Sequence, residues 1–134
     1  MTATVVYQGD LRTVATHVQS ASEIETDAPV DNNGKGERFS PTDLVAAALA
    51  SCMLTIMGIA SRTHGLNIDG TRCEVEKVMA SNPRRIAEIK IALYFNSVHS
   101  FTDKDRKILE NAALTCPVFL SLHADLTKTI TFHW

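Results

Sequence analysis

The chain has 134 residues, 45% of them hydrophobic, which is enough for one domain with one hydrophobic core. Its formal net charge is −2 at pH 7, so there is no basic field of the kind that favours nucleic acid or an anionic membrane. Five scattered histidines show no close metal-ligand spacing. The three cysteines lie far apart, and the first ten residues predict a strand and a turn rather than a signal peptide. We therefore expect a protein of the reducing cytoplasm.

Three short strands are predicted near the N-terminus, over residues 2–7, 11–18 and 22–26. Together they suggest a small antiparallel meander. Residues 27–39, DAPVDNNGKGERF, are rich in Asp, Asn and Gly and predict a loop. A loop of this length in a compact domain is more often functional or mobile than idle.

The segment 40–60, SPTDLVAAALASCMLTIMGIA, predicts a long helix that is apolar on nearly every side. Ser40 can cap it, Pro41 suits the first helical position, and Asp43 favours the helix dipole. His64 and Gly65 mark its end. A membrane span is the alternative, but the segment is Ala-rich, slightly short and interrupted by hydroxyl residues. We therefore predict a buried core helix.

Alternating strands are predicted over residues 68–80 and 85–96, joined by a turn at 81–84. Thr102 then caps a second helix that runs to residue 115, and Pro117 opens a shorter one over 117–124. Residues 126–132 alternate as a last strand. Segregated strands with a few helices predict an α+β fold, in a single domain spanning residues 1–134.

Cys52 lies in the interior of the long helix, about 15–18 Å from its N-terminus at the rise of an α-helix. The helix dipole fades within the first turn and cannot activate this thiol. Activation would need a cation or a hydrogen-bond donor from elsewhere. The alternative is an inert thiol in an Ala-rich core.

Cys116 lies between Thr115 and Pro117, where a new helix should begin. That position predicts a lowered thiol pKa, unless the residue is simply the corner of the chain. Cys73 lies in a strand and is interpreted as structural. Cys52 and Cys116 are 64 positions apart and form neither a metal motif nor a CxxC pair. If folding brings them together, they suggest attack on a peroxide followed by disulfide closure.

Two motifs resemble the OsmC/Ohr family of thiol peroxidases. The first is SPTDL at residues 40–44, followed by the Ala-rich helix and Cys52. The second is TCPV at residues 115–118, followed by a helix and a final strand. The order of the predicted elements matches as well, so the resemblance covers nearly the whole chain.

The resemblance implies an OsmC-like fold with antiparallel sheets around the central helix, which strands of a second copy clasp in an intertwined homodimer. Active sites would lie at the dimer interface. Cys52 would reduce an organic hydroperoxide to an alcohol and become a sulfenic acid, and Cys116 would condense with it to a disulfide. An external dithiol or a lipoylated protein would restore both thiols, with no metal or dissociable cofactor. Neither a nucleic-acid nor a membrane partner is expected.

The chain departs from the family pattern at two positions. Thr42 stands where the clearest peroxidases carry Glu, and the register of their loop Arg falls near Asn32. Position 42 is about 15 Å from Cys52 along one helix, so a carboxylate partner would have to come from another chain or from a folded-back loop. This again points to an interface site.

Arg38 is the nearest candidate to replace the missing Arg, with Lys35 next, and Glu37 or Asp43 could supply a carboxylate. We predict that Arg38 stabilises the Cys52 thiolate and orients the peroxide. Its alternative role is a solvated loop charge. The nearby apolar residues could favour alkyl peroxides or could be plain core; they are Met53, Leu54, Met57 and Phe119.

Two other functions remain open. The same dimer could bind an apolar ligand or sense redox state with little or no peroxidase turnover, and the missing Glu favours this. A hot-dog acyl-thioester fold also wraps a sheet around a long apolar helix. It would not need two cysteines, and no Asp or Glu is well placed on this helix to serve it.

Overall fold

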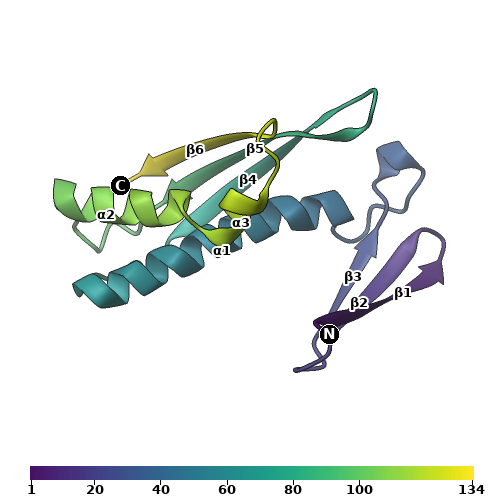
Figure 1. The fold of residues 1–134 in the computed structure, drawn as a ribbon, viewed down its shortest axis with the longest axis horizontal. Coiled ribbons are helices and arrows are strands. Elements are labelled where there is room, and N and C mark those ends of the chain that lie inside the picture. The colour runs from purple at the N-terminus through teal and green to yellow at the C-terminus, as the bar shows by residue number, and fades with distance from the viewer. The chain divides into compact units, whose positions relative to one another are not determined.

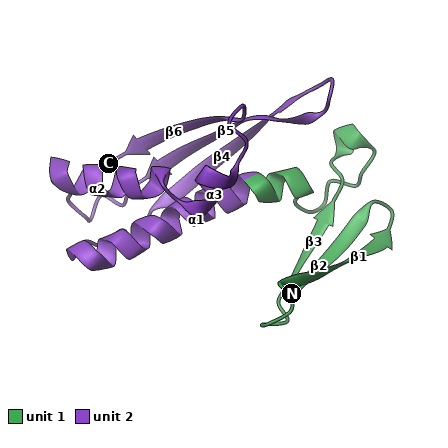
Figure 2. Cartoon of the chain, in the orientation of Figure 1, with its two compact units in different colours: residues 1–45 green, residues 46–134 purple.

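The structure is a computed structural model that describes residues 1–134. Its strands and helices occur in groups along the chain, and they fall into two compact units, residues 1–45 and 46–134 (Figures 1 and 2). In chain order they are β1 (Ala3–Gly9), β2 (Arg12–His17), β3 (Glu23–Asp27), the 3-10 turn η1 (Val30–Asn32), α1 (Pro41–His64), β4 (Arg72–Ala80), β5 (Arg85–Tyr94), α2 (Asp103–Leu114), α3 (Pro117–Ser121) and β6 (Thr127–His133).

The first unit is an antiparallel meander of β1, β2 and β3. Val5 pairs with Ala15, which pairs with Ile24, so these apolar side chains share one face of the sheet. Val5 is 65% exposed and Ile24 is 52% exposed. The buried residues of this unit are polar: Thr26, Asp27 and Ser40. Its sheet therefore has no apolar core of its own.

Helix α1 begins where the sequence predicts. The backbone N–H of Ser40 donates to Asp43 Oδ2 at 2.8 Å, and the N–H of Asp43 donates back to Ser40 Oγ at 3.1 Å. This reciprocal pair satisfies donors that the first turn leaves free. The helix ends at His64, and Gly65 follows with a φ of 66°, the left-handed conformation in which glycine carries no steric penalty.

The second unit is built on the sheet β4-β5-β6, with α1, α2 and α3 packed on one side of it (Figure 1). Alternate residues of β5, among them Ile89, Ile91 and Leu93, are fully buried against the helices. The opposite face of the sheet is polar. It carries ion pairs such as Lys90–Glu76, whose charged atoms lie 3.3 Å apart. This alternation places the only apolar core of the chain between β5 and the helices.

Helix α1 contributes a narrow buried stripe to that core, made of Ala46, Leu49, Ala50, Met53 and Met57. Its other side is open, and Ile59 is 57% exposed. In length and composition α1 would also pass as a membrane span, a test that the core helix of a soluble protein also meets. Within one chain, α1 is thus buried on one side only, whereas the sequence predicts a helix that is buried on nearly every side.

The mixed α+β fold and the order of elements agree with the sequence, with boundaries shifted by a few residues. Residues 68–71 precede β4, and α3 ends at Ser121 rather than near residue 124. The second sheet also differs from a purely antiparallel one, because β6 runs parallel to β5. This pairing follows from the connection, since β6 returns to the sheet only after α2 and α3 have crossed it.

Candidate functional site

Cys52 lies at the edge of the buried stripe of α1, between the core side and the open side of the helix. It is partly exposed and packs against the core residues. Its neighbour Met53 and the later Met57 are fully buried in the core. These two methionines therefore serve as core, while Leu54 and Phe119 are only partly buried.

Cys116 is the N-cap of α3 and is completely buried. Pro117 follows it at the first helical position, as the sequence predicts. The backbone N–H of Phe119 donates a hydrogen bond to Cys116 Sγ at 3.4 Å. The thiol is thus held at a fixed place where the chain turns from α2 into α3.

The predicted lowering of the Cys116 pKa is wrong. Burial raises the pKa of this thiol, the N–H of Phe119 opposes that shift, and the contact with Cys52 raises it further. Helix α3 has only five residues, so its dipole cannot outweigh desolvation. Cys116 therefore rests as a neutral thiol at pH 7.

The structure brings the two remote thiols together within the second unit. The thiol of Cys52 interacts with the thiol of Cys116 and raises its pKa, although 64 residues separate the two in the sequence. Both are free thiols here. A disulfide requires two thiols that the fold brings within reach of each other. The arrangement can therefore support sulfenic acid and disulfide chemistry.

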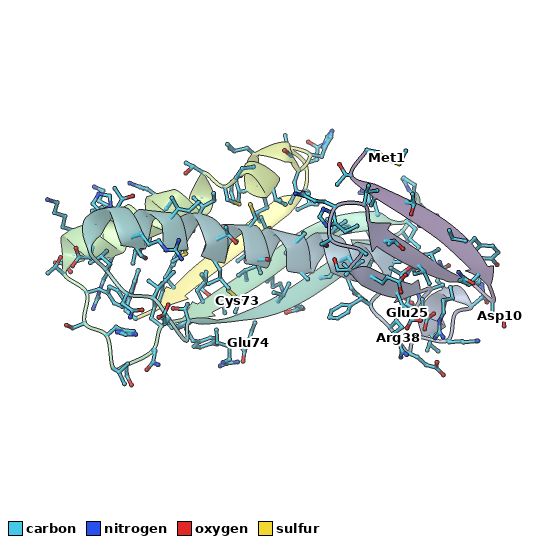
Figure 3. The ribbon with its side chains drawn as sticks, turned by 90° about the horizontal axis from the view of Figure 1, so that it is seen from below. Met1, Asp10, Glu25, Arg38, Cys73 and Glu74 are labelled. Carbon is cyan, nitrogen blue, oxygen red and sulfur yellow. The ribbon has the colours of Figure 1, made fainter.

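Cys73 lies on β4 and packs against the same core (Figure 3). Burial raises the pKa of this thiol, and no charged partner opposes the shift. A buried thiol with a raised pKa is a poor nucleophile. The geometry agrees with a structural role for Cys73.

Arg38 belongs to the first unit, where its Nε lies 2.7 Å from Glu25 Oε2 (Figure 3). Its Nη1 also donates to the carbonyl oxygen of Glu37 at 3.1 Å. Its side chain is 48% exposed. Arg38 is thus an ion-paired residue of this unit, and its action on Cys52 stays a prediction. Lys35 pairs with Asp10 at 3.5 Å.

Sequence reasoning missed a second arginine in the first unit. Arg12 holds Asp27 through two hydrogen bonds, Nε to Oδ1 at 2.7 Å and Nη2 to Oδ2 at 2.8 Å, and it also reaches Glu37 Oε2 at 3.1 Å. The Arg12 guanidinium holds the pKa of Asp27 below its usual range, against the opposing effect of burial. The structure pairs Arg12 with Asp27 across β2 and β3, whereas the sequence predicts a loop at residue 27 and therefore could not reveal this pair.

A cavity of about 520 Å³ in the second unit is not formed by the thiols. It lies beside the later half of α1, with Thr55, Ile59, Arg62 and Leu66 among its lining residues. No group of three or more His, Cys, Asp or Glu side chains could hold a metal ion. The paired thiols are therefore the reactive groups on which a functional argument can rest.

The sequence model of the family described as OsmC-like protein matches residues 34–131, which include both thiols of the pair. The chain belongs to the OsmC-like protein family. None of the curated proteins matches the chain. The family assignment therefore rests on the match of the family model to residues 34–131.

One similar structure is a candidate osmotic stress induced and detoxification response protein from Psychrobacter arcticus 273-4. It is 57% identical, has a TM-score of 0.95, and is aligned over 99% of this OsmC-like chain and 96% of its own. Two others share the fold at low identity and are named organic hydroperoxide resistance proteins. The protein from Legionella pneumophila, named OsmC, is 12% identical, with a TM-score of 0.78 over 100% of this chain and 98% of its own. The protein from Elizabethkingia anophelis is 14% identical, with a TM-score of 0.72 over 99% and 96%.

Proposed function

We propose that this OsmC-like protein is a cysteine-based peroxidase that reduces organic hydroperoxides to alcohols. The observation that carries the proposal is the contact between Cys52 and Cys116 inside one compact unit. A thiol with a purely structural role needs no second thiol beside it. A thiol that becomes a sulfenic acid needs a neighbouring thiol to form a disulfide. The names of the low-identity neighbours, organic hydroperoxide resistance proteins, are consistent with this chemistry.

The cycle has three balanced steps. The Cys52 thiolate attacks the terminal peroxide oxygen of ROOH, the O–O bond breaks, and with one proton the alcohol ROH leaves while Cys52 becomes a sulfenic acid. Cys116 then attacks the Cys52 sulfur and water leaves, which closes the disulfide. A dithiol reductant, free or carried as a lipoyl group on a protein, restores both thiols and becomes a disulfide itself. None of these steps requires a metal or a dissociable cofactor.

The exposed apolar surfaces support a homodimer as the working form. The first unit leaves Val5, Tyr7 and Ile24 more than half exposed, and α1 leaves Ile59 equally open. An apolar sheet face that is left exposed in this way marks an interaction site. A second copy of the chain would cover it, and Arg38 of one copy could then serve Cys52 of either. We place this dimer in the cytoplasm, where the reductant keeps thiols reduced.

The test is a thiol titration after one equivalent of cumene hydroperoxide. Free thiols should fall from three per chain to one, and peptide mapping should find a Cys52–Cys116 disulfide. Cys52→Ser should lower turnover on the order of a thousandfold or more, because the nucleophile is lost. Cys73→Ser is the matched control and should react like wild type. If Cys52→Ser consumes peroxide as fast as wild type, the peroxidase proposal is wrong.

A dimer that binds an apolar ligand or senses redox state is the second candidate. It is favoured by Thr42, which cannot supply a carboxylate, and by the engagement of Arg38 with Glu25. Such a protein would form the disulfide with a stoichiometric oxidant but would not turn over. Steady-state peroxide consumption in the presence of dithiothreitol separates the two functions: sustained consumption supports the enzyme, and a single equivalent consumed supports the sensor.

A further inference from the structure

The two sulfurs of the pair differ sharply in access. Cys116 is 0% exposed, enclosed where α2 turns into α3, whereas Cys52 is partly exposed at the edge of the buried stripe of α1. A second copy of the chain can only bury Cys116 further. Cys52 must stay reachable if a hydroperoxide is to meet it. This difference in exposure determines which sulfur of the disulfide a reductant can reach.

We propose that the reductant attacks only the Cys52 sulfur of the Cys52–Cys116 disulfide, so that Cys116 is always the leaving thiol. The inference rests on the proposed peroxidase function and adds the direction of its reductive half. Thiol–disulfide exchange depends on which sulfur the incoming thiolate can reach. The reductant would thus use the same entrance as the peroxide.

The exchange is balanced as follows. A thiolate of the dithiol forms a bond to Cys52 Sγ, and the bond between Cys52 and Cys116 breaks. Cys116 leaves as a thiolate and takes up a proton. The second thiol of the reductant then attacks the sulfur of the first, which closes the reductant's own disulfide and releases Cys52 as a thiolate. Two electrons pass from the dithiol to the protein.

The surroundings of Cys116 suit a leaving thiolate that stays in place after the disulfide breaks. The N–H of Phe119 donates to its sulfur and so favours the charged form at the moment of departure. Burial then favours its return to the neutral thiol. Because Cys116 stays beside Cys52, it can also re-attack an adduct on Cys52 and expel it. An adduct on Cys52 therefore persists only if the second thiol of the reductant, or an alkylating reagent, reacts before Cys116 re-forms the disulfide.

The three cysteines fall on separate tryptic peptides, which makes the test direct. Cleavage after Arg38 and Arg62 releases Cys52, cleavage after Arg72 and Lys77 releases Cys73, and cleavage after Lys107 and Lys128 releases Cys116. The protein, with Cys73→Ser to prevent scrambling, is oxidised with one equivalent of diamide. It then receives a pulse of 2-mercaptoethanol and is quenched in acid with N-ethylmaleimide. Mass spectrometry locates the mercaptoethanol adduct and the maleimide label.

We expect the mercaptoethanol adduct on the Cys52 peptide and the maleimide on the Cys116 peptide, with at least a tenfold preference. Equal adducts on both peptides, or a preference for Cys116, would overturn the inference and would indicate that α3 opens before reduction. Diamide bypasses the peroxide, so the two proposals fail separately. A disulfide formed by diamide but never by hydroperoxide refutes the peroxidase alone. If diamide forms no Cys52–Cys116 disulfide, the inference fails as well.

Discussion

The two compact units of the chain are stabilised in different ways. Every fully buried large apolar side chain lies in residues 46–134, while the buried side chains of residues 1–45 are polar. The second unit is an ordinary core of helices on a sheet. The first is a three-stranded sheet held by hydrogen bonds and by the pair Arg12–Asp27, with its apolar residues facing outward. An isolated small sheet is marginal without an apolar covering, so the stability of the first unit depends less on its own core than that of the second.

The largest expected effect of a single substitution is in the core of the second unit. Leu49→Ala, which empties a position that is 0% exposed, should lower the free energy of unfolding by about 2–5 kcal/mol. Leu120→Ala, at a position 69% exposed in the same unit, is the matched control and should change it by less than about 0.5 kcal/mol. Urea denaturation followed by circular dichroism measures both. Equal effects would contradict the division between core and surface.

The next effect is on association. Val5→Asp combined with Ile24→Asp places two charges on the exposed apolar face of the first sheet, where the two residues lie in register. If that face is covered by a second copy, the dimer should weaken by about a hundredfold or more, since a buried unpaired charge costs several kcal/mol. Sedimentation velocity over a concentration series measures this. Glu23→Gln with Glu25→Gln, on the other face of the sheet, is the control. An unchanged dimer in the Asp variant would mean that this face is not the interface.

A smaller effect concerns acid and is confined to the first unit. Arg12 lowers the pKa of Asp27 in the folded state, so the pair stabilises the unit above the unfolded carboxyl pKa of about 4. That stabilisation is lost as the pH falls through the lower folded value. Hydrogen exchange of β2 and β3 amides, corrected for intrinsic rates, should therefore accelerate as the pH falls below about 4. Asp27→Asn should remove this dependence, while Asp10→Asn, at a side chain 83% exposed, should retain it.

The smallest effect is expected on the polar face of the second sheet. Lys90→Gln removes an ion pair with Glu76 in which both side chains are well exposed. Such a pair contributes at most about 1 kcal/mol and is screened by salt. Urea denaturation at low and high salt should show wild type and variant converging as salt rises. A larger loss that is insensitive to salt would show that this face is covered in solution.

Local signals made much of the fold predictable. Ser40, Pro41 and Asp43 mark the start of α1 and Gly65 its end, and Thr102 and Pro117 begin the other two helices. These are interactions between neighbours in sequence, so composition and spacing reveal them. The parallel pairing of β6 with β5 was not predictable in this way. It depends on how the chain crosses the sheet and leaves no mark on β6 itself.

The candidate site divides along the same line. The sequence by itself determined the two cysteines, their places inside one helix and at the start of another, and the membership of the chain in its family, because each is written in residues a few positions apart. Only the tertiary structure decided that Cys52 and Cys116 touch, that burial raises the pKa of Cys116, and that Arg38 pairs with Glu25. Proximity, desolvation and ion pairing depend on groups that the fold brings together from distant positions, and no local pattern specifies them.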